Sequence, residues 1–426
     1  MTDKMLRYSL SGVDPNDRSF IHHLSTPSIG GVNIVTAPYC RQVFVSLSKD
    51  AVRLLSEEGY IIVPVHGVKA SPVKPSTVTT PIDIIGAYES SPGDIYDLLG
   101  INRFKLSISP PLSGLGYCVA VIDTGIRSTH QLLGGKVIYS KNFTEDQDGD
   151  IFDHGTGVAS IIHAVAPDVS ILDMKVLGDN GEGTEEEAAL AINECIELLY
   201  TNIEIAPNVI NMSIGSPDDG NPSNPIRAAC KEAMAQGIVV VAAAGNDGPG
   251  ASTVINPACE PYVVAVGSVT KPELEVSSFS SRGPTTEGEI KPDTTFIGED
   301  LIIASSDDDS EIAAKSGTSF SAPLVSGIIL LTMEGLVKTY SIPAEMYVGK
   351  NVLTSTMVID KMLPSVCMKP EGAPEGKDNA YGYGLPVGSA IRHTTTAAGV
   401  IDIEGTIALS MSMMLMIMMS RIVARE

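Results

Sequence analysis

Short runs of apolar, often β-branched residues recur through the middle of the chain, and they constrain its fold more than any other feature. Runs of this kind are typical of strands in a parallel sheet that is covered on both faces. Helical stretches at 184–200 and 225–236 lie between them, as crossover connections require. We therefore predict an α/β fold in which a parallel sheet carries helices on both faces. The apolar runs are 118–122, 170–176, 208–212, 238–243 and 263–266.

Three polar motifs contain the groups needed for nucleophilic attack on a carbonyl. They are VIDTG around Asp123, DHGTG around His154 and GTSFSAP around Ser319. A serine hydroxyl can attack, an imidazole can take its proton, and a carboxylate can hold the imidazole in the required tautomer. Taken singly, such residues more often belong to a turn, to a surface or hydrogen-bonded core histidine, or to a helix cap than to a catalytic site. Together and in this order they predict a catalytic triad.

A fourth motif, VVVAAAGN, ends at Asn246 and indicates a buried strand followed by a glycine turn. An amide presented by such a turn can donate to the oxyanion of a tetrahedral intermediate. After Ser319 an apolar helix is predicted at 322–333, with Pro323 in its first turn. Ser319 is therefore expected at a helix N-terminus, where developing negative charge is favoured. We reject a membrane span there because the run is too short.

Together the four motifs resemble those of the subtilisin-like serine proteases, peptidase family S8. The resemblance covers roughly residues 94–391. It implies that Ser319 is the nucleophile, His154 the general base and later the acid, and Asp123 the orienting carboxylate. It also implies that Asn246 and the backbone N–H of Ser319 are the oxyanion donors. No organic cofactor is implied.

The same resemblance indicates where a substrate would lie. The family holds its substrate as an extra strand between two backbone segments, which match 181–183 and 213–215 here. Ile255 stands where many members have a glycine at the floor of the pocket for P1, the residue before the cleaved bond. We therefore expect a shallow pocket that prefers small or medium apolar P1 residues. The residues implied for substrate binding are Gly181, Gly183, Ser213, Ile214, Gly215, Ala243, Gly245 and Ile255.

Two departures from the family pattern are visible in the motifs. Gly157 and Leu324 stand where the family usually has histidines. Neither histidine transfers protons in the family, so the departures leave the predicted catalysis intact.

The region before the catalytic motifs resembles the inhibitory propeptide of the family. Residues 42–47 alternate like a strand, Ser48 can cap a helix that runs through Glu58, and 60–65 reads as a second strand. A propeptide would leave its C-terminal end in the cleft like a product, and we expect self-cleavage near 87–93. An ordinary structural subdomain is the alternative.

Four segments are predicted along the chain. Residues 1–39 form an N-terminal leader, and 40–93 form the propeptide-like α+β subdomain with its proline-rich linker. Residues 94–392 form the catalytic domain. Residues 393–426 form a methionine-rich tail, whose run at 408–419 could pack on the domain, pair with another subunit or lie at a membrane interface. Packing on the domain is the expected arrangement.

Composition excludes several classes of function. The formal net charge of −23 over 426 residues would repel nucleic acid. The six cysteines are scattered without a CxxC pair, which favours buried free thiols over a disulfide framework. The first thirty residues contain no apolar segment typical of a secretory signal, so an intracellular protein is expected.

The acidic loop at 145–150 is a candidate metal site. Asp146, Asp148 and Asp150 could bind a structural calcium ion through carboxylate oxygens. The spacing is not that of an EF-hand, and a solvated acidic loop explains it equally well.

The sequence as a whole predicts a serine endopeptidase that acts on protein or peptide substrates through an acyl-enzyme. It would be made as a self-processed zymogen that is inhibited by its own N-terminal segment. One alternative is a catalytically idle protein of the same fold that binds peptides, and another is a processing peptidase dedicated to one partner.

Overall fold

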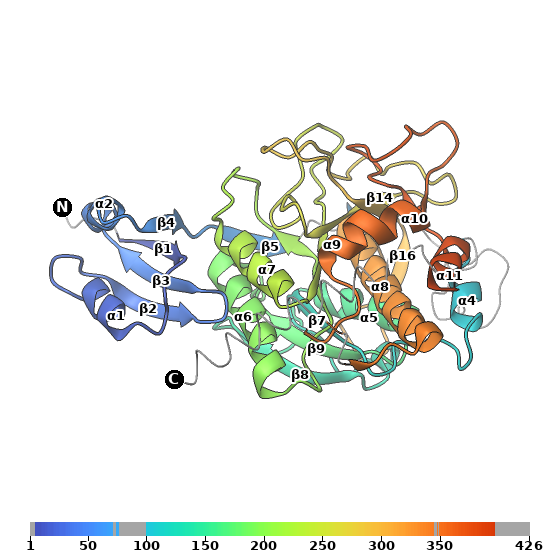
Figure 1. The fold of residues 1–426 in the computed structure, drawn as a ribbon, viewed down its shortest axis with the longest axis horizontal. Coiled ribbons are helices and arrows are strands. Elements are labelled where there is room, and N and C mark those ends of the chain that lie inside the picture. Colours follow the sequence, from blue (N-terminus) through green and yellow to red (C-terminus); the bar gives the residue numbers. More distant parts are fainter. Residues whose placement is uncertain (1–4, 71–73, 76–98, 345–346, 348, 397–426) are drawn as a thin grey trace.

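The computed structural model describes residues 5–70, 74–75, 99–344, 347 and 349–396. It consists of a small N-terminal sheet domain beside a larger α/β domain (Figure 1). The predicted tail run at 408–419 and the predicted cleavage region at 87–93 lie outside the described residues.

A seven-stranded sheet forms the centre of the larger domain, in the order β15-β14-β13-β11-β7-β9-β8. All neighbouring strands are parallel, which confirms the predicted α/β fold. The two edge strands, β8 and β15, contain polar residues at several positions and were not predicted from apolar runs. The strands are β7 (Cys118–Asp123), β8 (Val137–Asn142), β9 (Ser170–Lys175), β11 (Val209–Met212), β13 (Val239–Ala243), β14 (Val264–Val269) and β15 (Thr294–Ile297).

Successive side chains of the central strands point to opposite faces of the sheet. Val119 and Val121 of β7 belong to the apolar cluster that contains α5 (Gly155–Val165) and α8 (Thr318–Tyr340). Ala120 and its alternate neighbours belong to the cluster that contains α6 (Glu185–Thr201) and α7 (Pro225–Ala235). Both faces are therefore covered by helices, as predicted.

Local signals in the sequence set the starts of the covering helices. The Thr184 hydroxyl accepts from the N–H of Glu187, and the Glu187 carboxylate accepts from the N–H of Thr184, which is a capping box at the start of α6. Asn224 caps α7, and Pro225 occupies its first position, where no N–H is needed.

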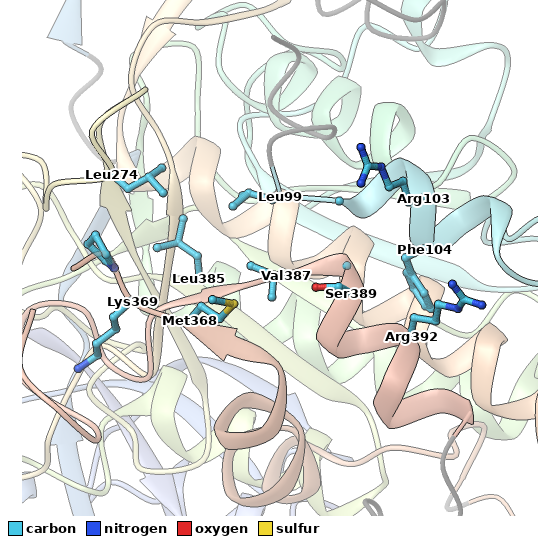
Figure 2. A pocket seen from close by; sticks show the side chains of 13 residues that line it. Leu99, Arg103, Phe104, Leu274, Met368, Lys369, Leu385, Val387, Ser389 and Arg392 are labelled. Carbon is cyan, nitrogen blue, oxygen red and sulfur yellow. The ribbon is translucent and has the colours of Figure 1, made fainter. Parts of the chain in front are cut away.

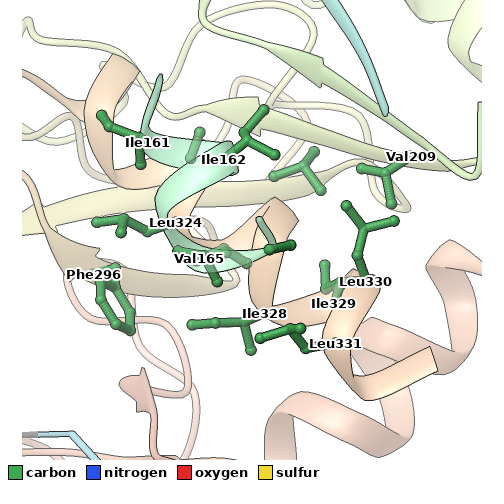
Figure 3. Close-up of a cluster of buried hydrophobic side chains, with 14 of the residues drawn as sticks. Ile161, Ile162, Val165, Val209, Phe296, Leu324, Ile328, Ile329, Leu330 and Leu331 are labelled. Carbon is green, nitrogen blue, oxygen red and sulfur yellow. The ribbon is translucent and has the colours of Figure 1, made fainter. Parts of the chain in front are cut away.

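Helix α8 is longer than predicted and runs 23 residues through the interior of the domain (Figure 3). Among the described residues it is the one helix long and apolar enough to cross a membrane. The shortness of the run is therefore the wrong reason to reject a membrane span. The valid reason is burial, since 94% of its most apolar window is enclosed by the protein, as in the core helix of a globular domain.

The N-terminal domain is an antiparallel sheet in the order β2-β3-β1-β4, packed against two helices. Its elements predicted within 42–65 are confirmed, but the separate leader at 1–39 is wrong. Strand β1 pairs with both β3 and β4, and the apolar side chains of β1 and α1 fill the core of this domain. The elements are β1 (Leu6–Ser11), α1 (Arg18–Leu24), β2 (Val32–Ala37), β3 (Gln42–Leu47), α2 (Lys49–Glu57) and β4 (Ile61–Pro64).

Polar contacts attach the N-terminal domain to α6 and α7. The Arg7 guanidinium forms a bidentate pair with the Glu186 carboxylate. The backbone N–H groups of Tyr39 and Cys40 both donate to Oδ1 of Asn193, at 2.8 and 3.2 Å. These contacts fix the small domain against the helix face of the large one.

Smaller elements close the far end of the large domain. Between α4 and α11 lies a pocket of about 590 Å³, lined by apolar residues and by Arg103, Lys369 and Arg392 (Figure 2). None of the predicted site residues lines it. These elements are α4 (Ile101–Leu106), η2 (Gln131–Leu133), α9 (Ser355–Met357), η4 (Val358–Met362), α10 (Leu363–Val366), β18 (Cys367–Met368), β19 (Leu385–Pro386) and α11 (Gly388–Thr396).

The contact between α5 and α8 predicts a specific packing defect. A Cβ on Gly327 would lie 2.6 Å from Cβ of Val165, so Gly327→Ala should lower the free energy of unfolding by about 1 to 3 kcal/mol. Gly335→Ala in the same helix meets side chains only at 3.4 Å and should be neutral or stabilising by up to about 1 kcal/mol. Urea unfolding of both variants tests this, and equal stabilities would contradict it.

Candidate active site

Asp123 and His154 form the centre of the site. Asp123 ends β7, and its Oδ1 accepts from the N–H of Thr124 at 2.8 Å and from Nδ1 of His154 at 2.7 Å. Both side chains are buried. Nε2 of His154 has no hydrogen-bond partner among the described residues. An imidazole held through Nδ1 in this way can accept a proton at Nε2.

Asp150 holds the loop that carries His154. Its Oδ1 accepts from Thr124 Oγ1 at 2.8 Å and from the N–H of Asp153 at 2.9 Å. Its Oδ2 accepts from the N–H of His154 and from both the N–H and the hydroxyl of Thr156. One buried carboxylate therefore satisfies two N–H groups at the start of α5, those of His154 and Thr156, and ties them to Thr124 at the end of β7. Sequence reasoning missed this role, although a carboxylate four residues before His154 was the available signal.

The same contacts bear on the predicted calcium site. Oδ2 of Asp146 accepts from the N–H of Asp179, and Oδ1 of Asp148 accepts from Asn142. Across the described ranges, no group of three or more His, Cys, Asp or Glu side chains is arranged to hold a metal ion. Asp150 would bind calcium only by giving up hydrogen bonds that hold His154, so it does not fit a site shared with the other two. Calcium binding by this loop stays a prediction.

Ser319 is the second residue of α8, which begins at Thr318 rather than at 322. Pro323 therefore lies in the second turn of the helix, and its missing N–H leaves the carbonyl of Ser319 without a helical donor. The Ser213 hydroxyl replaces that donor at 2.8 Å, and the Ser319 hydroxyl lies 3.3 Å from the carbonyl oxygen of Ser213. Pro323 and Ser213 together fix the backbone that carries the predicted nucleophile.

Asn246 follows β13, whose last residue, Ala243, is fully buried. The amide oxygen of Asn246 accepts from the N–H of Thr318 at 3.0 Å and from the Thr318 hydroxyl at 2.9 Å. These bonds orient the amide so that its Nδ2 donor lies beside Gly317. The structure thus brings Asn246 to the start of the helix that carries Ser319, as the predicted oxyanion site requires.

A segment of the chain itself lies where a substrate strand was predicted. Strand β5 (Gly67–Ala70) pairs antiparallel with β10 (Glu182–Thr184) on one side and β12 (Ile214–Gly215) on the other. The N–H of Ala70 donates to the carbonyl of Gly181 at 3.0 Å. The two predicted backbone segments therefore do bind an extended strand between them.

The side chains of β5 alternate between the protein and solvent. Val68 and Ala70 are buried, whereas Lys69 is exposed. Beyond Ala70, β6 (Lys74–Pro75) pairs with β17 (Ile312–Ser316), just before Ser319. Strands β10, β12 and β17 are therefore all paired with segments from the N-terminal part of the chain.

Ile255 lies where the predicted P1 pocket would be. Its side-chain atoms approach to 2.6 Å from the position that a Cβ on Gly215 would take and to 3.1 Å from the corresponding position on Gly245. The isoleucine thus occupies the space between the two glycine-containing walls. This placement agrees with a shallow pocket.

Two further residues belong to this region: Phe152 at the rim of the cleft, and Gly157, where the family usually has a histidine. The ring of Phe152 packs on Gly181, beside the carbonyl that accepts from Ala70, a role that sequence reasoning missed. At Gly157 a Cβ would lie 2.5 Å from a side-chain carbon of Ile303. A histidine at that position would require the side chain of Ile303 to move.

Comparison with known proteins agrees with this geometry. The profile of the Subtilase family, Peptidase_S8, matches residues 114–384, and the chain belongs to this family. It is 31% identical over 257 residues to serine protease AprX of Bacillus subtilis, covering 52% of this chain and 58% of that protein. It is 35% identical over 248 residues to the major intracellular serine protease of the same organism, covering 54% and 70%. An intracellular serine protease of Paenibacillus polymyxa is 34% identical over 236 residues, covering 51% and 67%.

The family membership confirms the resemblance inferred from the four motifs. The match to AprX spans less than two thirds of that relative's length.

Asp173 of β9 is a buried carboxyl group close to this site. Burial raises its pKa to about 7, the effect of nearby Asp150 acts in the same direction, and the hydrogen bond from Ser140 Oγ to Oδ2 at 2.8 Å opposes them. The folded protein therefore holds this proton at pH values where the unfolded chain has released it.

This difference predicts a pH-dependent stability. As pH rises from about 4 to about 7, Asp173 should destabilise the folded state by up to about 4 kcal/mol. Asp173→Asn, which can still accept from Ser140, should remove this contribution and gain stability relative to the parent at pH 8 but not at pH 4. Urea unfolding of both proteins in a Ser319→Ala background measures the difference. A pH-independent difference would contradict the prediction.

Proposed function

We propose that this protein is a serine endopeptidase that hydrolyses peptide bonds through an acyl-enzyme. The hydrogen bond between Asp123 and His154, at the cleft where β5 is held as an extended strand, carries the proposal. The family membership and the names of the relatives support it.

The same groups act in both stages of the proposed reaction, formation of the acyl-enzyme and its hydrolysis. The Ser319 hydroxyl attacks the carbonyl carbon while Nε2 of His154 takes its proton, and the buried Asp123 carboxylate stabilises the resulting imidazolium. Nδ2 of Asn246 and the backbone N–H of Ser319 donate to the oxyanion. His154 then gives its proton to the leaving amine. Water hydrolyses the acyl-enzyme by the same steps, with His154 again as the base.

We further propose that the N-terminal domain and β5 inhibit the uncut protein. Asp123, His154 and Ser319 are all buried, while β5 occupies the predicted substrate strand. Strand β5 ends at Ala70, and β6 begins at Lys74 and pairs with β17 just before Ser319, so we propose self-cleavage between β5 and β6. Self-cleavage there would precede the region at 87–93 predicted from the sequence.

The first test is labelling by a fluorophosphonate, which reacts with activated serines. We expect one adduct on a shortened wild-type chain, while Ser319→Ala stays full length and unlabelled. Intact mass spectrometry distinguishes the outcomes. One adduct on a full-length wild type would keep the enzyme but discard the zymogen. An unlabelled wild type, even after limited proteolysis has removed the N-terminal domain, would favour an idle peptide-binding protein.

The second test concerns the P1 pocket. Ile255→Gly should open the space between Gly215 and Gly245 and raise kcat/KM for peptides with P1 Phe relative to P1 Ala by roughly 10- to 100-fold. Ile255→Leu, which keeps the side-chain volume, is the control and should leave the ratio near that of the wild type. Efficient wild-type cleavage after Phe or Tyr in a peptide library would refute the shallow pocket.

A further inference from the structure

The residue just before His154 has an unusual backbone conformation. Asp153 has a φ of 65°, in the left-handed region that residues other than glycine rarely adopt. Such a conformation is strained and persists only where surrounding contacts impose it. The contacts that hold Asp153 therefore also help to fix where the following imidazole begins.

Those contacts come from outside the histidine loop. Nζ of Lys315 donates to Oδ2 of Asp153 at 2.6 Å and also to its backbone carbonyl oxygen. The N–H of Ser306 donates to Oδ1 at 2.7 Å. The carboxylate and carbonyl of Asp153 are thus clamped together in the left-handed turn.

Lys315 connects two parts of the cleft. It lies in β17, four residues before Ser319, and its side chain is only 9% exposed. Within β17 it lies opposite Pro75 of β6. Burying an ammonium group is costly, so a pair of this kind is weak evidence for a purely stabilising role.

We propose that Lys315 and Asp153 are positioning residues that fix the orientation of His154 for proton transfer. The inference rests on the proposed peptidase function. Asp123 holds the imidazole through Nδ1, and Asp150 holds the backbone N–H of His154. The Lys315–Asp153 pair fixes the chain on the remaining side.

The proposal has an electrostatic consequence. The charged and titratable groups near His154 include Asp123 at the end of β7, Asp150 and Asp153 in its own loop, and Lys315 from β17. Strand β9 adds Lys175, opposite Asp123 in the sheet, and Asp173. The other elements packed nearby contribute apolar groups. Helix α8 contributes Phe320, whose ring centroid lies 5.5 Å from that of His154. Strand β16 (Leu301–Ala304) is apolar throughout. Removing either member of the pair leaves the other charge unbalanced beside the imidazole.

The test compares Lys315→Met, Asp153→Asn and the double variant, each as the full chain with any self-processing allowed to finish. We expect kcat for a peptide substrate to fall by roughly 10- to 100-fold in each single variant, with KM changed less than about threefold. The acid limb of the kcat/KM profile should move to higher pH in Lys315→Met and to lower pH in Asp153→Asn. It should return towards the wild type in the double variant.

Two more variants separate positioning from backbone strain and from misfolding. Asp153→Gly suits the positive φ but lacks the carboxylate, so it should lose activity like Asp153→Asn. Full activity of Asp153→Gly would mean that only the turn matters. Lys315→Arg keeps the charge and should leave the acid limb near that of the wild type, as a folded control.

Fluorophosphonate labelling of the wild type separates the positioning role of Lys315 and Asp153 from the proposed peptidase function. A labelled wild type whose single variants keep its kcat and acid limb would overturn the positioning role alone. Limbs that move in the same direction in both single variants would also overturn it. A wild type that stays unlabelled even after limited proteolysis has removed the N-terminal domain would overturn the peptidase function and this inference together.

Discussion

The parallel pairing of β7, β11 and β13 is the constraint on which the rest of the site depends. In a parallel sheet all strands end at one edge, so residues far apart in the chain meet there. Asp123 ends β7, Ser213 follows β11, and Asn246 follows the turn after β13. Helix α8 begins at the same edge and brings Ser319 to them. A shift of one strand by a single residue would separate these groups.

At this edge of the sheet, side chains form hydrogen bonds with backbone groups that would otherwise lack a partner. Pro323 removes a helical N–H, and the Ser213 hydroxyl supplies the lost bond to Ser319. Asp150 accepts from the N–H groups of His154 and Thr156 at the start of α5. Groups buried in this way are costly to leave unpaired, so each partner fixes the position of a predicted catalytic side chain. Preorganisation of this kind is what stabilisation of a developing charge requires.

Sequence reasoning recovered the features that depend on local pattern. The central strands, α6, α7 and the elements within 42–65 follow from apolar periodicity and capping residues, and short motifs identified Asp123, His154, Asn246 and Ser319. The roles of Asp150 and Lys315 escaped it, because they depend on contacts between segments distant in the chain. Lys315, for example, lies 162 residues from Asp153.

The difference between local pattern and long-range contacts also explains two wrong boundaries, the leader at 1–39 and the start of α8 at 322. Residues before 40 were assigned to a leader because β1 and β2 are short and mixed in polarity, and their pairing partners lie further along the chain. The start of α8 was placed at 322 because its first turn, with Ser319, contains no apolar run. Tertiary packing, rather than local propensity, determines both.

Strand β5 is part of the same chain as the edges it pairs with. A tethered segment of this kind has an effective concentration of order millimolar at its own binding site. A free peptide can therefore pair with β10 and β12 only by competing with β5, which stays attached to the chain. The pairing of β5 with β10 and β12 therefore depends on its covalent attachment as well as on the backbone hydrogen bonds that it makes.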